Sequence, residues 1–178
     1  MTAALARGLD DDLPPLTAAL SARGIAHAVV DWHDPDADWA AFGLVVVRSP
    51  WDYTRRHAEF LAWAQRVAGV TALANPPAIL GWSTDKRYLG DLAAAGVPVI
   101  ETEYAAPGEA MAWPDAEEVV VKPTISAGSI DTARHRASAR SEAEAHVARL
   151  HADGRTAMVQ PYLSAVDTAG ETEFCDRR

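Results

Sequence analysis

Apolar and polar positions along the first 75 residues alternate between short continuous runs and one helical period. Apolar runs at residues 25–30, 44–47 and 70–74 predict strands, because strands buried on both faces read as continuous apolar stretches. Between the last two runs, apolar residues keep the i, i+3, i+4, i+7 spacing of a helix face: Phe60, Trp63, Ala64 and Val67. Strands that alternate with helices predict a parallel sheet covered by helices on both faces.

An earlier helix is expected where three leucines share one face and Gly24 follows as a stop: Leu13, Leu16 and Leu20. Ser49 is expected to cap the next helix, with Pro50 in its first position. The segment Thr2–Leu5 is short for the first strand of such a domain. Either that strand is short or the natural start lies upstream.

Asn75-Pro76-Pro77 is the best candidate for a domain boundary, because two prolines continue neither a helix nor a strand. The predicted domains are therefore residues 1–76, 77–163 and 164–178. Ser141 and Glu144 fit a capping box for a helix that Gly154 ends. The remaining pattern predicts a helix over residues 84–95 and strands over 97–100, 118–122, 132–136 and 156–161, the third of these as a hairpin partner of the second.

The chain has 178 residues, 49% of them apolar, and a formal net charge of −9. The acidic balance argues against a nucleic-acid partner, since binding to phosphate backbones needs clustered positive charge. The single cysteine, Cys175, excludes an internal disulfide and disfavours a thiolate zinc site. No leader or long apolar span occurs, so no membrane partner is expected and the predicted location is cytoplasmic. P-loop, G-x-G-x-x-G and G-x-S-x-G motifs are absent.

Two lysines occupy positions where lysine is costly. Lys86 lies at a predicted helix start, where the helix dipole favours an acid, and Lys122 ends the valine run 119–121. A polyphosphate between them would explain both charges, since ammonium groups pair with phosphate oxygens. Small residues would let backbone N–H groups approach that phosphate: Ser126, Gly128 and Ser129. The alternative is that both lysines extend to solvent.

Three motifs in order resemble the ATP-grasp superfamily: Asp85-Lys86-Arg87-Tyr88-Leu89, Val119-Val120-Val121-Lys122-Pro123 and Val159-Gln160-Pro161-Tyr162-Leu163. Together with Asn75-Pro76, the last motif is similar to bacterial glutathione synthetase and related carboxylate–amine ligases. The resemblance implies an α/β fold. A Rossmann-like pre-ATP-grasp domain with a parallel sheet (1–76) precedes the first α+β lobe of an ATP-grasp domain (77–163), and residues 164–178 begin a second lobe that is otherwise missing.

By position, the resemblance implies that Lys86 and Lys122 hold the phosphates of ATP. It also implies that adenine is bound by Gln160, Tyr162 and Leu163, and that Glu171 accepts hydrogen bonds from the ribose hydroxyls. Taken alone, the segment 160–163 is equally well explained as an edge strand stopped by proline.

Arg48 follows the predicted strand 44–47, at the edge where open α/β sheets bind ligands. Its guanidinium is a candidate clamp for the carboxylate of a substrate. The alternative, equally supported by the sequence, is a salt bridge to Asp52 or a neighbouring acid.

ATP-grasp ligases resemble one another in chemistry: ATP phosphorylates a carboxylate, and an amine then attacks the acyl phosphate to form an amide. The Mg²⁺ ions that bridge the phosphates are held in the family by the second lobe, so this chain is expected to be an incomplete ligase with little turnover alone. A homodimer or a complementing C-terminal chain is left open, as is the small carboxylate substrate. The alternatives are a noncatalytic nucleotide- or metabolite-binding module, and two small α/β domains that bind an acidic metabolite and ignore ATP.

Overall fold

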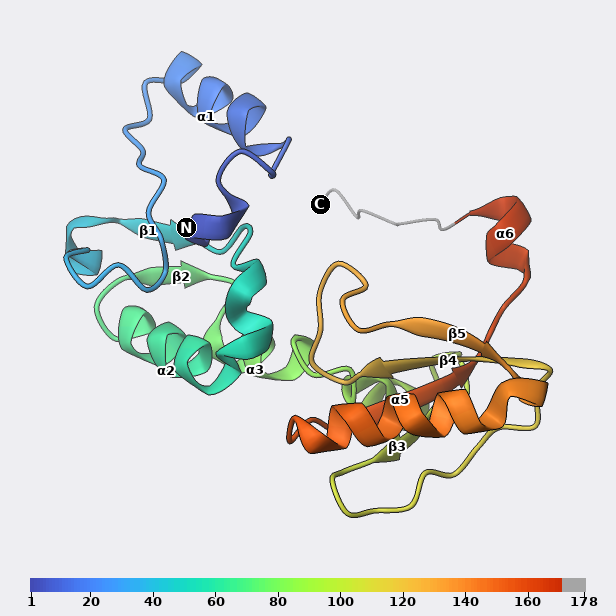
Figure 1. Ribbon diagram of the computed structural model, residues 1–178. Helices are drawn as coiled ribbons and strands as arrows, with labels where there is room; N and C mark the ends of the chain where they lie inside the picture. Colours follow the sequence, from blue (N-terminus) through green and yellow to red (C-terminus); the bar gives the residue numbers. More distant parts are fainter. Residues whose placement is uncertain (171–178) are drawn as a thin grey trace. The chain divides into compact units, whose positions relative to one another are not determined.

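The structure is a computed structural model that describes residues 1–170. It divides into two compact units (Figure 1). The first holds Met1–Tyr88 and Ile125–Gly128, and the second holds Leu89–Thr124 and the described chain from Ser129 onward. The boundaries at residues 76 and 163 stay predictions.

The first unit contains a short parallel sheet. Strands β1 (Leu44–Val46) and β2 (Ala72–Ala74) pair in parallel. Thr2 adds parallel bridges to Asp31 and to Ser49, so the beginning of the chain runs between these two segments. The parallel arrangement expected for this half is confirmed.

Residues 25–30 form no strand, so the prediction from their apolar run was wrong. At its end the segment meets Thr2: the Thr2 N–H donates to the Val30 carbonyl at 3.0 Å, and the Trp32 N–H donates to the Thr2 carbonyl at 3.0 Å. At its start the Ile25 N–H donates instead to the carbonyl of Leu20, in the preceding helix, at 3.0 Å. Ile25, at the start of the run, is 49% exposed. An apolar run becomes a strand only where neighbouring backbone offers hydrogen-bond partners along its length.

Helix α2 (His57–Ala68) carries the core of the first unit, and Figure 1 shows it beside β2. Its four predicted core positions are all buried: Phe60, Trp63, Ala64 and Val67. They pack with Trp32 and Val45, and the rings of Phe60 and Trp63 stack with their centroids 5.6 Å apart. Each fully buried side chain of this size contributes about 2 kcal/mol of transfer free energy. The periodicity therefore identified the correct face.

Ser49 does not cap a helix, contrary to the prediction. A 3-10 turn, η3 (Trp51–Arg55), follows it, and α2 begins only at His57. Ser49 is only 1% exposed, and its hydroxyl donates to the carboxylate of Asp10 at 2.7 Å. A side chain held by a partner elsewhere in the fold cannot also close a helix end.

The proline pair lies at the start of a helix. Pro77 begins α3 (Pro77–Ser83), and a separate helix, α4 (Tyr88–Ala94), replaces the single helix expected over residues 84–95. Proline fits the first turn of a helix because the N–H groups of that turn have no partner within the helix.

The second unit is an antiparallel sheet with one long helix on its face (Figure 1). The strand order is β3-β6-β4-β5, with β3 at Glu103–Ala105, β4 at Glu118–Pro123, β5 at Ala133–Arg136 and β6 at Ala157–Pro161. Strand β5 pairs with the valine strand β4, as predicted. Helix α5 (Arg140–Ala152) supplies two predicted core residues, Val147 and Leu150.

Two predictions for this unit were wrong. Residues 97–100 lie outside the sheet, and β3 takes the edge position because Ala105 is fully buried there against β6. The capping box is absent: α5 begins at Arg140, directly after the 3-10 turn Ala137–Ala139, so Ser141 already lies inside the first helical turn.

The other described helices are α1 (Leu13–Ala22), α6 (Ala165–Ala169) and two 3-10 turns, η1 (Ala4–Ala6) and η2 (Trp39–Ala41). Among residues 1–170, none of the helices has the length and apolar character needed to cross a lipid bilayer.

Candidate functional site

One face of the antiparallel sheet carries two of the side chains predicted to bind nucleotide, Lys122 and Gln160. Along β4, Val119, Val121 and Pro123 are buried, and the residues between them alternate to the other face. The register pairs Lys122 with Met158, so these two side chains share the face opposite α5. Lys122 is half-buried there.

Gln160 lies on the same face, opposite Val120 in the register. It is 5% exposed, and its Nε2 donates to Oγ1 of Thr102 at 2.8 Å. Thr102 passes the interaction on by donating to the carbonyl of Ile100 at 2.8 Å. The amide of Gln160 is therefore fixed in direction by a two-step hydrogen-bond chain.

Tyr162 and Leu163 follow β6. The guanidinium of Arg134 lies over the Tyr162 ring, 3.6 Å from its centroid, and the Tyr162 hydroxyl donates to Asp167. Arg134 also pairs with the carboxylates of Glu118 and Asp167, and the hydrogen bond from Arg134 lowers the pKa of Glu118. One face of the ring is thus occupied by a cation, while Leu163 is 47% exposed.

Lys86 and Ser126 come together in the first unit. The Nζ of Lys86 donates to the carbonyl oxygen and to the hydroxyl oxygen of Ser126, both at 2.8 Å. The Tyr53 hydroxyl makes a longer contact of 3.5 Å to the same carbonyl, and burial raises the pKa of that phenol. The loop 125–128 is therefore attached to the first unit through an ammonium group.

The loop after Ser126 has an unusual backbone. Gly128, Ser129 and Asp131 have φ values of +59°, +57° and +55°. The left-handed region costs a residue with a side chain about 1–2 kcal/mol, and such outliers cluster at functional sites. Backbone N–H groups of turns with left-handed residues form concave sites for anions.

Lys86 and Lys122 are the only two lysines in the sequence, and the other fourteen basic residues are arginines. A lysine presents a compact charge with three donors that rotate to suit a phosphate, whereas the arginine fork is rigid. Both lysines of the sequence therefore lie at the two positions for which phosphate contacts were predicted.

Arg48 makes a salt bridge to neighbouring acids. Its guanidinium contacts both carboxylate oxygens of Asp10, at 2.8 and 3.2 Å, and a carboxylate oxygen of Asp12 at 3.1 Å. The hydrogen bond from Arg48, helped by Ser49, lowers the pKa of Asp10 to about 2. Sequence reasoning had considered a salt bridge but did not name Asp10, which lies 38 residues away.

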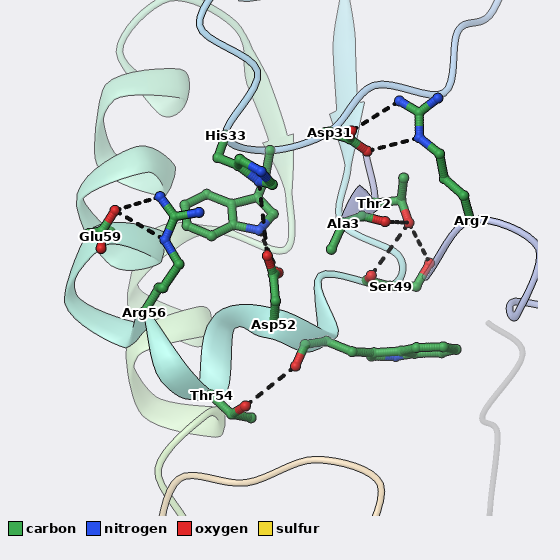
Figure 2. A network of polar contacts seen from close by, with 12 residues as sticks. Thr2, Ala3, Arg7, Asp31, His33, Ser49, Asp52, Thr54, Arg56 and Glu59 are labelled. Atoms are coloured by element: carbon green, nitrogen blue, oxygen red, sulfur yellow. Dashed lines mark hydrogen bonds and ion pairs between the residues drawn. The ribbon is translucent and has the colours of Figure 1, made fainter. Parts of the chain in front are cut away.

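Asp52, the acid that was named, has other partners (Figure 2). The Trp32 indole N–H donates to it at 2.7 Å, and Nδ1 of His33 lies 3.9 Å from its second oxygen. Arg56 lies over the Trp32 ring and pairs with Glu59 at 2.6 Å. These side chains follow the bridged segments at Asp31 and Ser49, the edge where parallel sheets bind ligands.

Glu171 lies outside the described residues. Among residues 1–170, no group of three or more His, Cys, Asp or Glu side chains is arranged to hold a metal ion.

Known proteins resemble the chain along nearly its whole length. A family described as the N-terminal domain of D-cycloserine synthetase DcsG matches residues 1–75. The cycloserine biosynthesis protein DcsG of Streptomyces lavendulae is 46% identical over 183 aligned residues, which cover 98% of this chain and 61% of that protein. The crystal structure of D-cycloserine synthetase DcsG superposes with a TM-score of 0.85 at 44% identity, covering 95% of this chain and 60% of the other.

A second solved structure shares the fold. It is a RimK-domain ATP-grasp protein from Sphaerobacter thermophilus, with a TM-score of 0.57 over 82% of this chain and 57% of its own, at 22% identity. The resemblance to ATP-grasp proteins is confirmed. The ATP-grasp fold class inferred from the three motifs is confirmed with it, and the chain spans about three fifths of the length of these ATP-grasp and DcsG relatives.

Proposed function

We propose that this chain supplies the nucleotide-binding part of an ATP-grasp ligase that joins a carboxylate to a nitrogen nucleophile through an acyl phosphate. The observation that carries the proposal is the placement of its two lysines: Lys122 is on the sheet face that also carries Gln160, and Lys86 is hydrogen-bonded to the loop at Ser126. In this reading both ammonium groups bind phosphate oxygens, and the sheet face with residues 160–163 binds adenine.

The reaction has two balanced steps. A carboxylate oxygen of the substrate attacks the γ-phosphorus of ATP, the bond to the leaving oxygen of ADP breaks, and an acyl phosphate forms. The nitrogen nucleophile then attacks the acyl carbon, loses a proton, and expels inorganic phosphate. Lys86 and Lys122 stabilise the negative charge on the phosphates, and their fixed bases preorganise that charge.

The substrate of this chain is inferred from its DcsG relatives. We propose formation of cycloserine or a close analogue, since cycloserine has an N–acyl bond within its ring, the bond type that an acyl phosphate forms with nitrogen. Mg²⁺ bound with ATP neutralises phosphate charge in this chemistry, and we assign none of its ligands to residues 1–170. Little or no turnover by this chain alone stays a prediction, which a coupled ATPase assay tests.

The two lysines allow a direct test of nucleotide binding. An amine-acylating reagent has three targets in this chain: Lys86, Lys122 and the α-amino group. We expect millimolar Mg-ATP to reduce acylation of both lysines several-fold, measured by mass spectrometry, while the α-amino group serves as the internal reference. Unchanged labelling of both lysines would overturn the proposal and favour a protein that ignores ATP.

Titration calorimetry adds a matched comparison. Lys122→Met removes the charge but keeps the aliphatic stem, and we expect it to weaken Mg-ATP binding at least tenfold. Arg136→Met removes a charge from the same sheet at a side chain that is 80% exposed, and it should leave binding within about twofold. ATP binding without turnover, even with complementing chains supplied, would favour the noncatalytic nucleotide-binding module.

A further inference from the structure

Two histidines of the second unit form a hydrogen-bonded pair that the proposed chemistry does not use. His146 on α5 is 4% exposed, and its Nδ1 lies 3.2 Å from Nε2 of His135 on β5. The other nitrogen of His146, Nε2, lies 3.2 Å from the carbonyl oxygen of Asp131. The three residues form a line from His135 on β5, through the ring of His146 on α5, to the carbonyl of Asp131 in the loop.

The carbonyl oxygen of Asp131 fixes the positions of the hydrogens in this line. A carbonyl oxygen only accepts, so Nε2 of His146 carries the hydrogen and donates to Asp131. When His146 is neutral, its Nδ1 is then an acceptor, and His135 must donate to it through Nε2. His135 thereby fixes the tautomer of His146, as the second partner of a ring nitrogen does at many histidine sites.

The carbonyl at the end of the line belongs to a strained turn. Ser129 and Asp131 are both left-handed residues with side chains, and the Thr132 N–H closes the turn by donating to the Ser129 carbonyl at 3.1 Å. Arg155 holds the same turn from another side, through an ion pair of 2.6 Å with the Asp131 carboxylate. Conformations of this kind persist only when surrounding contacts fix them.

We infer that His146 is a positioning residue for the turn Ser129–Thr132, and that the His135–His146 pair makes the rigidity of this turn depend on pH. Protonation of His146 at Nδ1 turns this acceptor into a donor, two N–H groups then face each other, and the line to Asp131 is disrupted.

The charged groups around His146 place this event below the ordinary histidine range. Burial, then Arg149 on the same helix and His135 on β5, lower the pKa of His146, while the Asp131 carbonyl and carboxylate oppose this. The turn is therefore fixed near neutral pH, and it loosens as pH falls through the lowered pKa of His146. If the loop binds phosphate as in the proposed function, on which this step rests, loosening of the turn in acid weakens that binding.

Amide hydrogen exchange of Thr132, measured by NMR without nucleotide, tests the inference. After correction for intrinsic exchange, we expect protection in the wild type to fall about tenfold from pH 7.5 to pH 5, the change for one lost hydrogen bond. His146→Gln keeps an amide donor toward Asp131 but does not titrate, so its protection should stay level. Protection of the Thr132 amide should also stay level in His135→Gln. This second variant replaces the first if His146→Gln fails to fold.

Two controls separate positioning from general instability. His151→Gln replaces a histidine of the same helix that contacts the Ala105 carbonyl at 3.0 Å, and it should keep the wild-type pH dependence. Arg155→Gln should lower protection at every pH and leave the slope intact. Level protection in the wild type, or an unchanged slope in His146→Gln, would overturn the inference.

Mg-ATP affinity at the same pH values then connects the turn to the nucleotide. Phosphate itself titrates in this range, so the informative quantity is the difference between the wild type and His146→Gln. We expect a several-fold larger loss in the wild type. If ATP does not bind at any pH but the turn still depends on pH, the proposed function is rejected and the role of His146 in the turn stands. If the wild type and His146→Gln lose Mg-ATP affinity equally, the effect of His146 on phosphate binding is rejected.

Discussion

Lys86 and Ser126 lie 40 residues apart in the sequence, yet the ammonium of Lys86 donates to two oxygens of Ser126 at 2.8 Å each. Ser126 is 8% exposed. The lysine that we predict to bind phosphate therefore contacts the loop that we also predict to bind phosphate.

Removing the hydroxyl of Ser126 should make Lys86 more reactive. Ser126→Ala deletes one of its two hydrogen bonds to this residue, and a hydrogen bond to a charged group contributes about 1.5–3 kcal/mol. We expect acylation of Lys86 to accelerate at least threefold, read by mass spectrometry of the labelled peptides. Ser129→Ala is the matched control from the same loop, and equal acceleration in both variants would show that the contact with Ser126 is not the cause.

Asp10 should make the stability of the first unit depend on acid. The pKa of Asp10 is lowered to about 2 from 3.8 by Arg48, so the folded state binds fewer protons than the unfolded state between these values. The stabilisation is complete above pH 3.8 and is lost as pH falls toward 2. We expect Asp10→Asn to lower the free energy of unfolding by about 1–2 kcal/mol at pH 7, measured with urea.

The same variant should lose part of the decline in stability between pH 5 and pH 2. Asp12→Asn provides the comparison, because the Asp12 side chain also meets Arg48 but is 83% exposed. Exposed ion pairs contribute about 0–1 kcal/mol. Similar losses in the two variants would contradict the central position given to Asp10.

Thr102 should contribute to stability through its hydrogen bond with Gln160. Thr102→Val removes the oxygen that accepts from the buried Gln160 amide, and an unsatisfied buried donor costs about 1–3 kcal/mol. Thr102→Ser keeps that oxygen and should cost less than half as much in thermal unfolding. If serine and valine are equally destabilising, packing of the methyl group rather than the hydrogen bond holds this edge of the sheet.

His57 should make the free energy of unfolding of the first unit depend on pH in a second range, at milder acidity than Asp10. Burial lowers the pKa of His57 from 6.5, and its Nε2 lies 2.7 Å from the hydroxyl of Thr84. The neutral form is favoured by folding, so the stabilisation is present above pH 6.5 and declines as pH falls through the lowered pKa. His57→Gln should flatten the slope of unfolding free energy from pH 7 to pH 5, whereas His27→Gln, at an exposed position, should not change it.

Much of this protein followed from its sequence alone. The i, i+3, i+4, i+7 spacing of Phe60 and its neighbours fixed the buried face of α2, and the valine run at 119–121 with its hairpin partner fixed β4 and β5. These features are local, because the period of apolar residues is set by the geometry of one helix or strand. The order of the three ATP-grasp motifs was likewise readable along the chain.

The tertiary structure decided which polar groups meet. Ser49 was predicted to cap a helix, but its hydroxyl donates to Asp10. The run at 25–30 was predicted to be a strand, but it meets Thr2 only at its end. The contacts of Lys86 with Ser126, and of His146 with His135 and Asp131, join segments that no local pattern connects. Such pairings depend on how elements pack, and a short polar side chain carries no sequence signal of the distant partner that folding brings to it.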